Sequence, residues 1–304
     1  MKKVKVTVPA STTNLGCGFD CLGLALSLYN SIEIEKIKEK KVIVEVKGEG
    51  EGVIPLNDKN IIFPALKMVF EKAGEKVEGI KIKEENNIPL ERGLGSSAAT
   101  RIGAIVAACN LLDLNLSRKE ILKMASSLEG HPDNAAASLL GGFVAVADDE
   151  KGPYWVRLSV PENLRVCVIL PEVKIPTEKA REALPEKVPL KDAIFNLSRV
   201  SILIPSLVQG RWENLAFATQ DKIHQPYRSK LLPQMRKVFE AALSQGAKGV
   251  FLSGAGSGIA AFCLEEEAEK IGEAMKKIFL EEGIKSYFLI LSIDNKGCRV
   301  NEKR

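Results

Sequence analysis

The chain has 304 residues, of which 45% are apolar, which is enough for one large or two medium-sized domains with cores of their own. Its 43 basic and 39 acidic side chains leave a net charge of +4, and aromatic residues make up 6%. The near balance of charge argues against a nucleic-acid-binding surface, and the few aromatic residues argue against a platform for stacked bases.

No apolar stretch approaches the roughly 20 residues that span a bilayer, so we expect a soluble protein. The N-terminal residues lack the long apolar core of a signal peptide. Six cysteines are scattered along the chain, and no pair has the spacing of zinc ligands. They are typical of reduced thiols, and we therefore expect a cytoplasmic protein.

The first half of the chain alternates strand and helix patterns. Val4–Val8 alternates apolar and polar residues like a strand, and we expect a loop of small and polar residues to follow at Ala10–Asp20. Ser117, with Glu120 three residues on, has the pattern of a capping box for a helix that runs to about Leu128. The other expected elements are strands at Leu24–Ile34, Val42–Val46, Ile80–Ile82 and Phe143–Val146, and helices at Ile61–Glu71, Ser96–Leu112 and Ala135–Leu140.

The second half begins near Trp155. Ala180–Val208 is mostly helical in pattern, with breaks expected at Pro185, Pro189 and Pro205. The mixture predicts an α+β fold with a domain boundary between residues 150 and 165. The other expected elements are strands at Val166–Leu170, Gly249–Leu252, Ile259–Cys263, Ser286–Ser292 and Cys298–Asn301, and helices at Leu231–Leu243 and Glu265–Glu281.

The most informative segment joins a strand to a helix around two glycines. Gly93 and Gly95 allow a positive φ and a close approach of the backbone to a ligand. Ser96 or Ser97 can cap the following helix, whose exposed N–H groups and dipole form an anion site, and a serine hydroxyl can ligate Mg²⁺ carried by phosphates. Glycine spacing alone leaves open an ordinary strand-to-helix turn. The segment is Pro89, Leu90, Glu91, Arg92, Gly93, Leu94, Gly95, Ser96, Ser97, Ala98 and Ala99.

This segment is not a Walker A loop, because no lysine follows its glycines. Phosphate charge therefore has to be met by the helix N-terminus, a metal ion and arginines from elsewhere in the chain.

Two further segments are rich in small residues. Asn14 and Asp20 lie in Pro9–Asp20, where an amide beside a carboxylate can hold an ammonium or hydroxyl group; the alternative is that both satisfy the loop backbone. Leu252–Gly258 has the spacing G-x-G-x-G and is followed by a strand pattern, so it is not a dinucleotide fingerprint. A structural glycine turn is the alternative there.

Taken in the order in which they occur along the chain, the three segments resemble the first, second and third signatures of the GHMP kinases, a family of ATP-dependent small-molecule kinases. Glu91 stands where the second signature usually has a small residue, and Ser257 stands where the third often has proline. The resemblance implies an N-terminal domain like domain 2 of ribosomal protein S5 over residues 1–155, with a left-handed βαβ crossover. It also implies a ferredoxin-like domain over residues 156–304, with ATP bound by Pro89–Ala99 between the two domains.

Within this family, the chain is most similar to the homoserine kinases, on the run Glu129-Gly130-His131-Pro132-Asp133-Asn134. The resemblance makes Glu129 and Ser97 ligands of Mg²⁺, and it places His131 and Asn134 against homoserine and its reacting hydroxyl. Taken alone, His131 would be a turn residue. Asparagine takes up no proton at neutral pH, so we expect direct attack by the substrate hydroxyl on the γ-phosphoryl group, oriented by Asn134. Asp133 is the alternative, as a base.

Two arginines complete the expected substrate site. Thr177 and Arg181 lie one helical turn apart and can face one pocket, and Arg228 follows further on. By the resemblance, Arg181 clamps the substrate carboxylate, which a guanidinium group holds in bidentate fashion. Taken alone, each arginine would be a surface residue. The substrate-binding residues expected are Asn14, Asp20, His131, Thr177, Arg181, Arg228 and Gly254.

The resemblance therefore implies that ATP and L-homoserine give ADP and O-phospho-L-homoserine, a step of threonine biosynthesis, in a homodimer. Another GHMP kinase, acting on a mevalonate- or shikimate-type alcohol, is the nearest alternative. A GHMP-fold nucleotide-binding regulator without catalysis is an alternative of a different class, and a nicotinamide oxidoreductase built on Gly254–Gly258 is the most remote.

Overall fold

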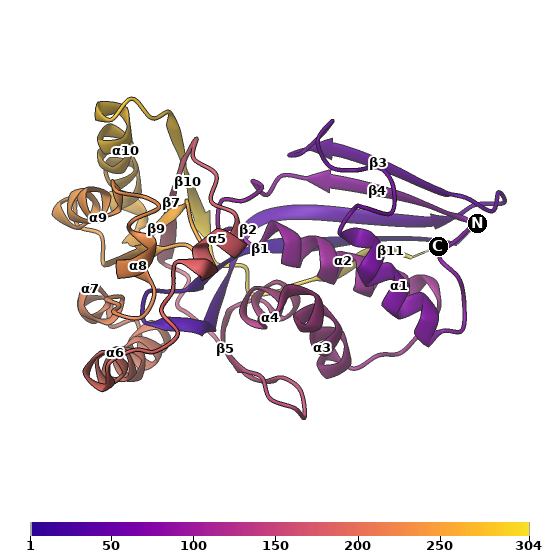
Figure 1. Cartoon of the computed structure of the whole chain (residues 1–304), viewed down its shortest axis with the longest axis horizontal. Helices are drawn as coiled ribbons and strands as arrows, with labels where there is room; N and C mark the ends of the chain where they lie inside the picture. Colours follow the sequence, from indigo (N-terminus) through magenta and orange to yellow (C-terminus); the bar gives the residue numbers. More distant parts are fainter. Residues whose placement is uncertain (1, 304) are drawn as a thin grey trace.

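A computed structural model describes residues 2–303. Two β-sheets adjoin along the long axis of the molecule, each with its own helices (Figure 1). The first sheet has seven strands, in the order β11-β1-β2-β4-β3, with β5 pairing β2 and β6 pairing β5. These strands are β1 (Lys3–Asn14), β2 (Gly18–Lys36), β3 (Val42–Gly48), β4 (Ile80–Asn86), β5 (Phe143–Ala147), β6 (Tyr154–Leu158) and β11 (Arg299–Lys303).

The hairpin of β1 and β2 forms the centre of the first sheet. The alternation of β1 buries Val4, Val6 and Val8 against the helices. The loop expected at Ala10–Asp20 is wrong, because β1 continues to Asn14 and β2 begins at Gly18. The small residues of this segment are fully buried and paired with β2, so their size reflects close packing and not a loop.

One face of the first sheet is covered by α1 (Ile62–Lys72), α2 (Ser96–Leu111), α3 (Arg118–Glu129) and α4 (Asp133–Leu140) (Figure 1). β3 and β4 run parallel, with α1 between them in the sequence; the handedness of this crossover stays a prediction. The capping box of α3 is confirmed: Ser117 Oγ accepts the Glu120 N–H at 3.2 Å, and Glu120 Oε2 accepts the Ser117 N–H at 2.9 Å.

The second sheet has the order β10-β7-β9-β8 and packs against α9 (Met235–Ser244) and α10 (Glu265–Glu281). Its strands are β7 (Leu164–Pro171), β8 (Gly249–Leu252), β9 (Ile259–Leu264) and β10 (Ser286–Ser292). The remaining helices are α5 (Thr177–Glu182), α6 (Leu190–Gln209), α7 (Leu215–Ala218) and α8 (Gln225–Arg228), with a 3₁₀ turn at Trp212–Asn214.

Two helices differ from the sequence prediction at positions near a proline. Pro205 lies inside α6 and does not break it. The carbonyl group of Ser201 loses its helical partner there, and Ser201 is exposed, so water can replace the missing N–H group. The helix expected from Leu231 begins only at Met235, two residues after Pro233, because proline disfavours helical backbone at the residue before it.

Segments from beyond residue 155 also join the first sheet. Trp155 lies in β6, which pairs with β5, and β11 near the C-terminus pairs with β1. The division into residues 1–155 and 156–304 therefore stays a prediction. Between residues 2 and 303, no helix is both long and apolar enough to cross a membrane.

Candidate active site

The three glycine-rich segments of the sequence meet in one place. We call Pro89–Ala99 the phosphate loop and Leu252–Gly258 the third loop. Ser253 Oγ of the third loop donates a hydrogen bond to the carbonyl oxygen of Gly93 at 2.6 Å and lies 2.8 Å from Thr12 Oγ1 of β1. The contact between Ser253 and Gly93 joins residues 160 positions apart in the sequence. The site therefore lies where the end of β1 meets loops from both sheets.

Glycine is required in the phosphate loop by both conformation and space. Gly93 and Gly95 have φ values of +71° and +68°. A Cβ atom would lie 1.9 Å from the carbonyl oxygen of Ser253 at Gly93, and 2.1 Å from Ser11 Oγ at Gly95. No L side chain fits these positions, so the loop backbone can approach a ligand closely.

The N-terminus of α2 has no side-chain cap. Gly95 is the N-cap residue, so the prediction that Ser96 or Ser97 caps this helix is wrong, since both lie within its first turn. The first N–H groups of α2 are left for an anion, which the helix dipole also favours. Glu91, the departure from the family signature, is exposed to solvent.

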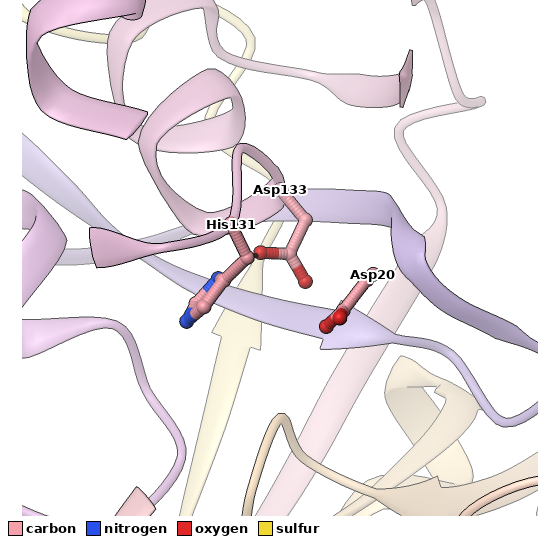
Figure 2. A group of neighbouring side chains, drawn as sticks. All are labelled: Asp20, His131 and Asp133. Atoms are coloured by element: carbon pink, nitrogen blue, oxygen red, sulfur yellow. Dashed lines mark hydrogen bonds and ion pairs between the residues drawn. The ribbon is translucent and has the colours of Figure 1, made fainter. Parts of the chain in front are cut away.

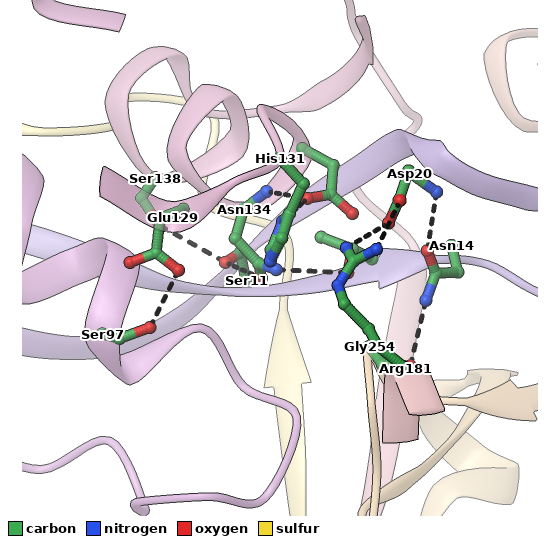
Figure 3. Close-up of polar contacts among 12 residues, drawn as sticks. Ser11, Asn14, Asp20, Ser97, Glu129, His131, Asn134, Ser138, Arg181 and Gly254 are labelled. Atoms are coloured by element: carbon green, nitrogen blue, oxygen red, sulfur yellow. Dashed lines mark hydrogen bonds and ion pairs between the residues drawn. The ribbon is translucent and has the colours of Figure 1, made fainter. Parts of the chain in front are cut away.

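A serine and a glutamate meet beside this helix start (Figure 3). Ser97 Oγ donates a hydrogen bond to Glu129 Oε2 at 3.0 Å. Ser97 is in the first turn of α2 and Glu129 is the last residue of α3, and the packing of these helices brings them together. A hydroxyl and a carboxylate oxygen are ligands that Mg²⁺ prefers, so the pair predicted as a metal site has a suitable donor set.

Arg101 is a polar neighbour that sequence reasoning missed. Its Nη1 donates to Glu129 Oε1, the carboxylate oxygen that Ser97 does not use. Arg101 stands four residues after Ser97 on the predicted helix, and this spacing could have identified it as a neighbour on the same face.

Asn134, the second residue of α4, lies against the phosphate loop. Its Oδ1 accepts a hydrogen bond from Ser11 Oγ at 2.9 Å (Figure 3). Its Nδ2 lies 3.4 Å from Thr13 Oγ1. A Cβ atom on Gly95 would lie 2.8 Å from Asn134 Oδ1. Ser11 and Thr13 were also missed, although both belong to the segment that resembles the first signature.

His131, Asp133 and Asp20 form a group (Figure 2), with ligand atoms within 4.8 Å of one another. His131 Nδ1 is 2.6 Å from Asp133 Oδ1, which also accepts the Asn134 N–H at 2.8 Å. Burial acts to lower the pKa of His131, but the hydrogen bond and charge of Asp133 outweigh it, and the pKa is raised above its ordinary value. Because His131 Nδ1 and Asp133 Oδ1 are engaged with each other and both oxygens of Asp20 bind Arg181, we do not interpret this group as a metal centre.

Asp20 and Arg181 form a bidentate ion pair, with Arg181 Nη1 and Nη2 at 3.1 and 3.0 Å from the two carboxylate oxygens. Asn14 is bound to backbone at both ends of its amide: Nδ2 donates to the Gly254 carbonyl and Oδ1 accepts the Asp20 N–H, each at 2.9 Å. Asn14 therefore satisfies backbone groups, which is the alternative that the sequence left open, whereas the carboxylate of Asp20 binds Arg181 and not the backbone. A substrate role for Asn14 stays a prediction.

Arg228 is nearly fully buried. Its Nε donates to the carbonyl oxygen of Ala180 at 3.1 Å and its Nη1 to that of Gly254 at 3.0 Å. Burial lowers the pKa of Arg228 to about 10, so the group stays charged at neutral pH. Arg181 and Arg228 both lie over the ring of Phe19, 5.8 and 5.2 Å from its centre. The structure therefore brings both arginines to one ring, and their role in substrate binding stays a prediction.

Thr177 is the one predicted substrate residue without such contacts. It is the first residue of α5 and is exposed. Among residues 2–303, the polar network that holds Arg181 and Asp20 does not include it.

Comparison with known families gives two matches. A model of the GHMP kinases N terminal domain matches residues 60–142, and a model of GHMP kinases C terminal matches residues 203–281.

Full-length relatives are similar along almost the whole chain. A homoserine kinase of Persephonella marina is 40% identical over 300 residues, which is 99% of each chain. One of Moorella thermoacetica is 42% identical over 295 residues, 97% of this chain and 99% of the relative.

Solved structures extend the similarity to the fold. The crystal structure of homoserine kinase from Cytophaga hutchinsonii superimposes with a TM-score of 0.89 at 33% identity, covering 98% of this chain and 97% of that one. Mevalonate kinase from Methanococcus jannaschii has a TM-score of 0.68 at 19% identity, covering 98% of both chains, a likeness of fold alone.

Proposed function

Because the chain belongs to the GHMP kinase family, among the homoserine kinases, we propose that its active site transfers the γ-phosphoryl group of ATP to the side-chain hydroxyl of L-homoserine. The products are ADP and O-phospho-L-homoserine, and the step belongs to threonine biosynthesis. One observation carries the assignment of the site, which is that Asn134 lies between its nucleotide and substrate sides. Asn134 binds Ser11, whose N–H donates to the Leu94 carbonyl of the phosphate loop, and its own N–H binds Asp133, which lies beside Asp20.

The nucleotide side of the site is the phosphate loop and the open N-terminus of α2. The N–H groups there bind phosphate oxygens. Ser97 and Glu129 would hold Mg²⁺, which neutralises negative charge on the phosphates when it is bound. No Walker lysine contributes charge here.

The substrate side suits an α-amino acid. Such a molecule carries a carboxylate and an ammonium group on one carbon atom, and Arg181 and Asp20 present the two opposite charges next to each other. Arg181 binds the carboxylate and Asp20 the ammonium group. The other proposed substrate-binding positions are Asn14, His131, Arg228 and Gly254, together with Thr177, which is on the same helix as Arg181 but outside the polar network of this pair.

The chemistry requires positioning more than a base. Asn134 cannot accept a proton at neutral pH, and its amide orients the attacking hydroxyl toward the γ-phosphoryl group. Oδ1 of Asp133 is already engaged, because it accepts from the Asn134 N–H and contacts His131, so this oxygen is not free to take the proton of the substrate hydroxyl. The hydroxyl proton passes to phosphate or solvent as the phosphoryl group is transferred.

A substrate panel tests this function directly. ADP release is measured with homoserine, mevalonate and shikimate at equal concentrations, and we expect turnover to be fastest with homoserine. Faster turnover of another alcohol would assign the site to that alcohol. ATP binding without turnover of any alcohol would favour a nucleotide-binding regulator.

We also propose a homodimer in the cytoplasm. All six cysteines are free thiols, which suits a reducing compartment. Light scattering checks the assembly, since a dimer has about twice the chain mass of 33.1 kDa.

A further inference from the structure

The carboxylate of Glu129 is shared between two residues of one helix face. Ser97 and Arg101 stand one turn apart on α2, and each uses a different oxygen of Glu129: Ser97 Oγ lies 3.0 Å from Oε2, and Arg101 Nη1 donates to Oε1. The oxygen that faces Ser97 is therefore the one that Arg101 leaves open. The side chain of Glu129 is 7% exposed and that of Arg101 is 18% exposed, so solvent screens this ion pair only weakly.

Arg101 is held by one side chain among residues 2–303. Its only hydrogen-bond partner there is Glu129, and its buried Nε makes no hydrogen bond. A guanidinium group has five N–H donors, so most of its donor capacity is unused. Arg228 differs, because two backbone carbonyl groups hold it in place. Arg101 can therefore exchange its partner without breaking a wider network.

The charges explain what this arrangement does to a cation. Glu129 and Arg101 together are neutral, so the pair offers little net attraction to a divalent ion. A cation at Ser97 Oγ and Glu129 Oε2 would also stand close to the positive charge of Arg101, with weak screening. A nucleotide polyphosphate makes binding of the divalent ion favourable, because its negative charge offsets the charges of both the ion and the Arg101 guanidinium group.

We propose that Arg101 is a positioning residue that keeps the Ser97–Glu129 pair from binding a free divalent cation, so that the metal enters only with the nucleotide. Arg101 also aims Oε2 of Glu129 at Ser97 by holding Oε1. The inference rests on the proposed function for the nucleotide, but it concerns binding of the metal alone and is measured without turnover.

The test is a titration of the full chain with Mn²⁺ alone, without nucleotide, at about pH 8. Electron paramagnetic resonance measures the concentration of free Mn²⁺ at each step. Mn²⁺ is used because it takes the same oxygen ligands as Mg²⁺. We expect weak binding to the unsubstituted protein. Removing the charge with Arg101→Gln or Arg101→Met should tighten Mn²⁺ binding about tenfold or more. Arg101→Lys retains the charge and should keep the binding weak.

Two controls isolate the mechanism. Arg118→Gln removes the same charge from an exposed residue at the other end of α3, and it should leave Mn²⁺ binding unchanged. Combining Arg101→Gln with Glu129→Gln should abolish the gain. Thermal melting checks that each variant is folded.

Tight binding of Mn²⁺ alone to the unsubstituted protein would overturn the proposal without any variant. Equal or weaker binding by a folded Arg101→Gln variant would also overturn it. A failure of the proposed function looks different: no alcohol in the substrate panel would be turned over, whatever the Mn²⁺ affinities are.

Discussion

Asp20 and Arg181 face each other across 161 positions of sequence, with both nitrogen-to-oxygen distances of the bidentate pair at 3.1 Å or less. Asp20 lies just inside β2 and Arg181 on α5, so the pair joins the first sheet to a helix of the second half. The side chains are 32% and 37% exposed, which leaves the pair open to a small charged molecule. In the proposed complex, an amino acid would replace this one ion pair with two, one to Arg181 and one to Asp20.

Arg181→Lys should weaken homoserine binding by about one to a few kcal/mol, because lysine cannot make the bidentate contact to a carboxylate. The KM for ATP should stay nearly constant, since Arg181 contacts Asp20 and not the phosphate loop. Steady-state kinetics with each substrate varied in turn measure both quantities. An unchanged homoserine KM would contradict the assignment of Arg181.

Asn134→Ala should lower kcat by about 10²-fold, in the range found when one preorganised polar group is removed from an active site. Asp133→Asn discriminates the alternative, because a general base contributes about 10²–10⁴-fold. A loss of kcat in that range with Asp133→Asn, and full kcat with Asn134→Ala, would make Asp133 the base. Single-turnover kinetics separate this effect from product release.

Glu129→Gln should raise the Mg²⁺ concentration needed for half-maximal activity at least about tenfold, since an amide is a weaker ligand than a carboxylate. Ser97→Ala should act in the same direction. Removing divalent cations with EDTA should abolish activity, and Mg²⁺ should restore it. Ser127→Ala, an exposed serine near the end of α3, is the control and should not change the Mg²⁺ dependence.

Gly95→Ala should lower both stability and ATP affinity. The added Cβ would lie 2.1 Å from Ser11 Oγ, so the phosphate loop or the end of β1 has to move. Gly52→Ala is the matched control, because Gly52 also has a positive φ, of +74°, but nothing lies within 4 Å of its Cβ position. Thermal melting and ATP titration should show a much larger effect at Gly95. Equal effects at both glycines would mean that backbone strain alone is responsible.

Glu84→Gln should stabilise the protein at alkaline pH. Glu84 is buried, and burial raises its pKa above the ordinary value of 4.5, against the hydrogen bond from Asn60. The folded protein therefore holds a proton that the unfolded chain releases, and stability falls as pH rises from about 4.5 through the raised pKa. Glutamine carries no charge, so it removes this penalty, and its Oε1 keeps the acceptor for Asn60.

The measurement is the melting temperature of both proteins from about pH 4.5 to pH 8. The difference should be small at the acid end and grow with pH. Glu85→Gln is the control of opposite sign, because the hydrogen bond from Lys5 lowers the pKa of that carboxylate. A constant difference across the range would contradict the assigned titration of Glu84.

Local signals explain which features the sequence predicted well. The capping box of Ser117 and Glu120, the helix after the phosphate loop, and the turn of the third loop all depend on residues within a few positions of one another. Local signals led to a wrong prediction where packing against residues distant in the sequence determines the structure. The small residues of β1 indicated a loop, yet they are strand residues packed tightly against other elements.

The sequence by itself determined the family, the fold class and the segments from which the site is built, because glycine, capping residues and apolar periodicity act over short distances. Only the tertiary structure decided which side chains meet. It pairs Asp20 with Arg181 and Arg101 with Glu129, and it binds the side chain of Asn14 to backbone atoms. Such pairings depend on how helices and sheets pack, and no short-range pattern records that packing.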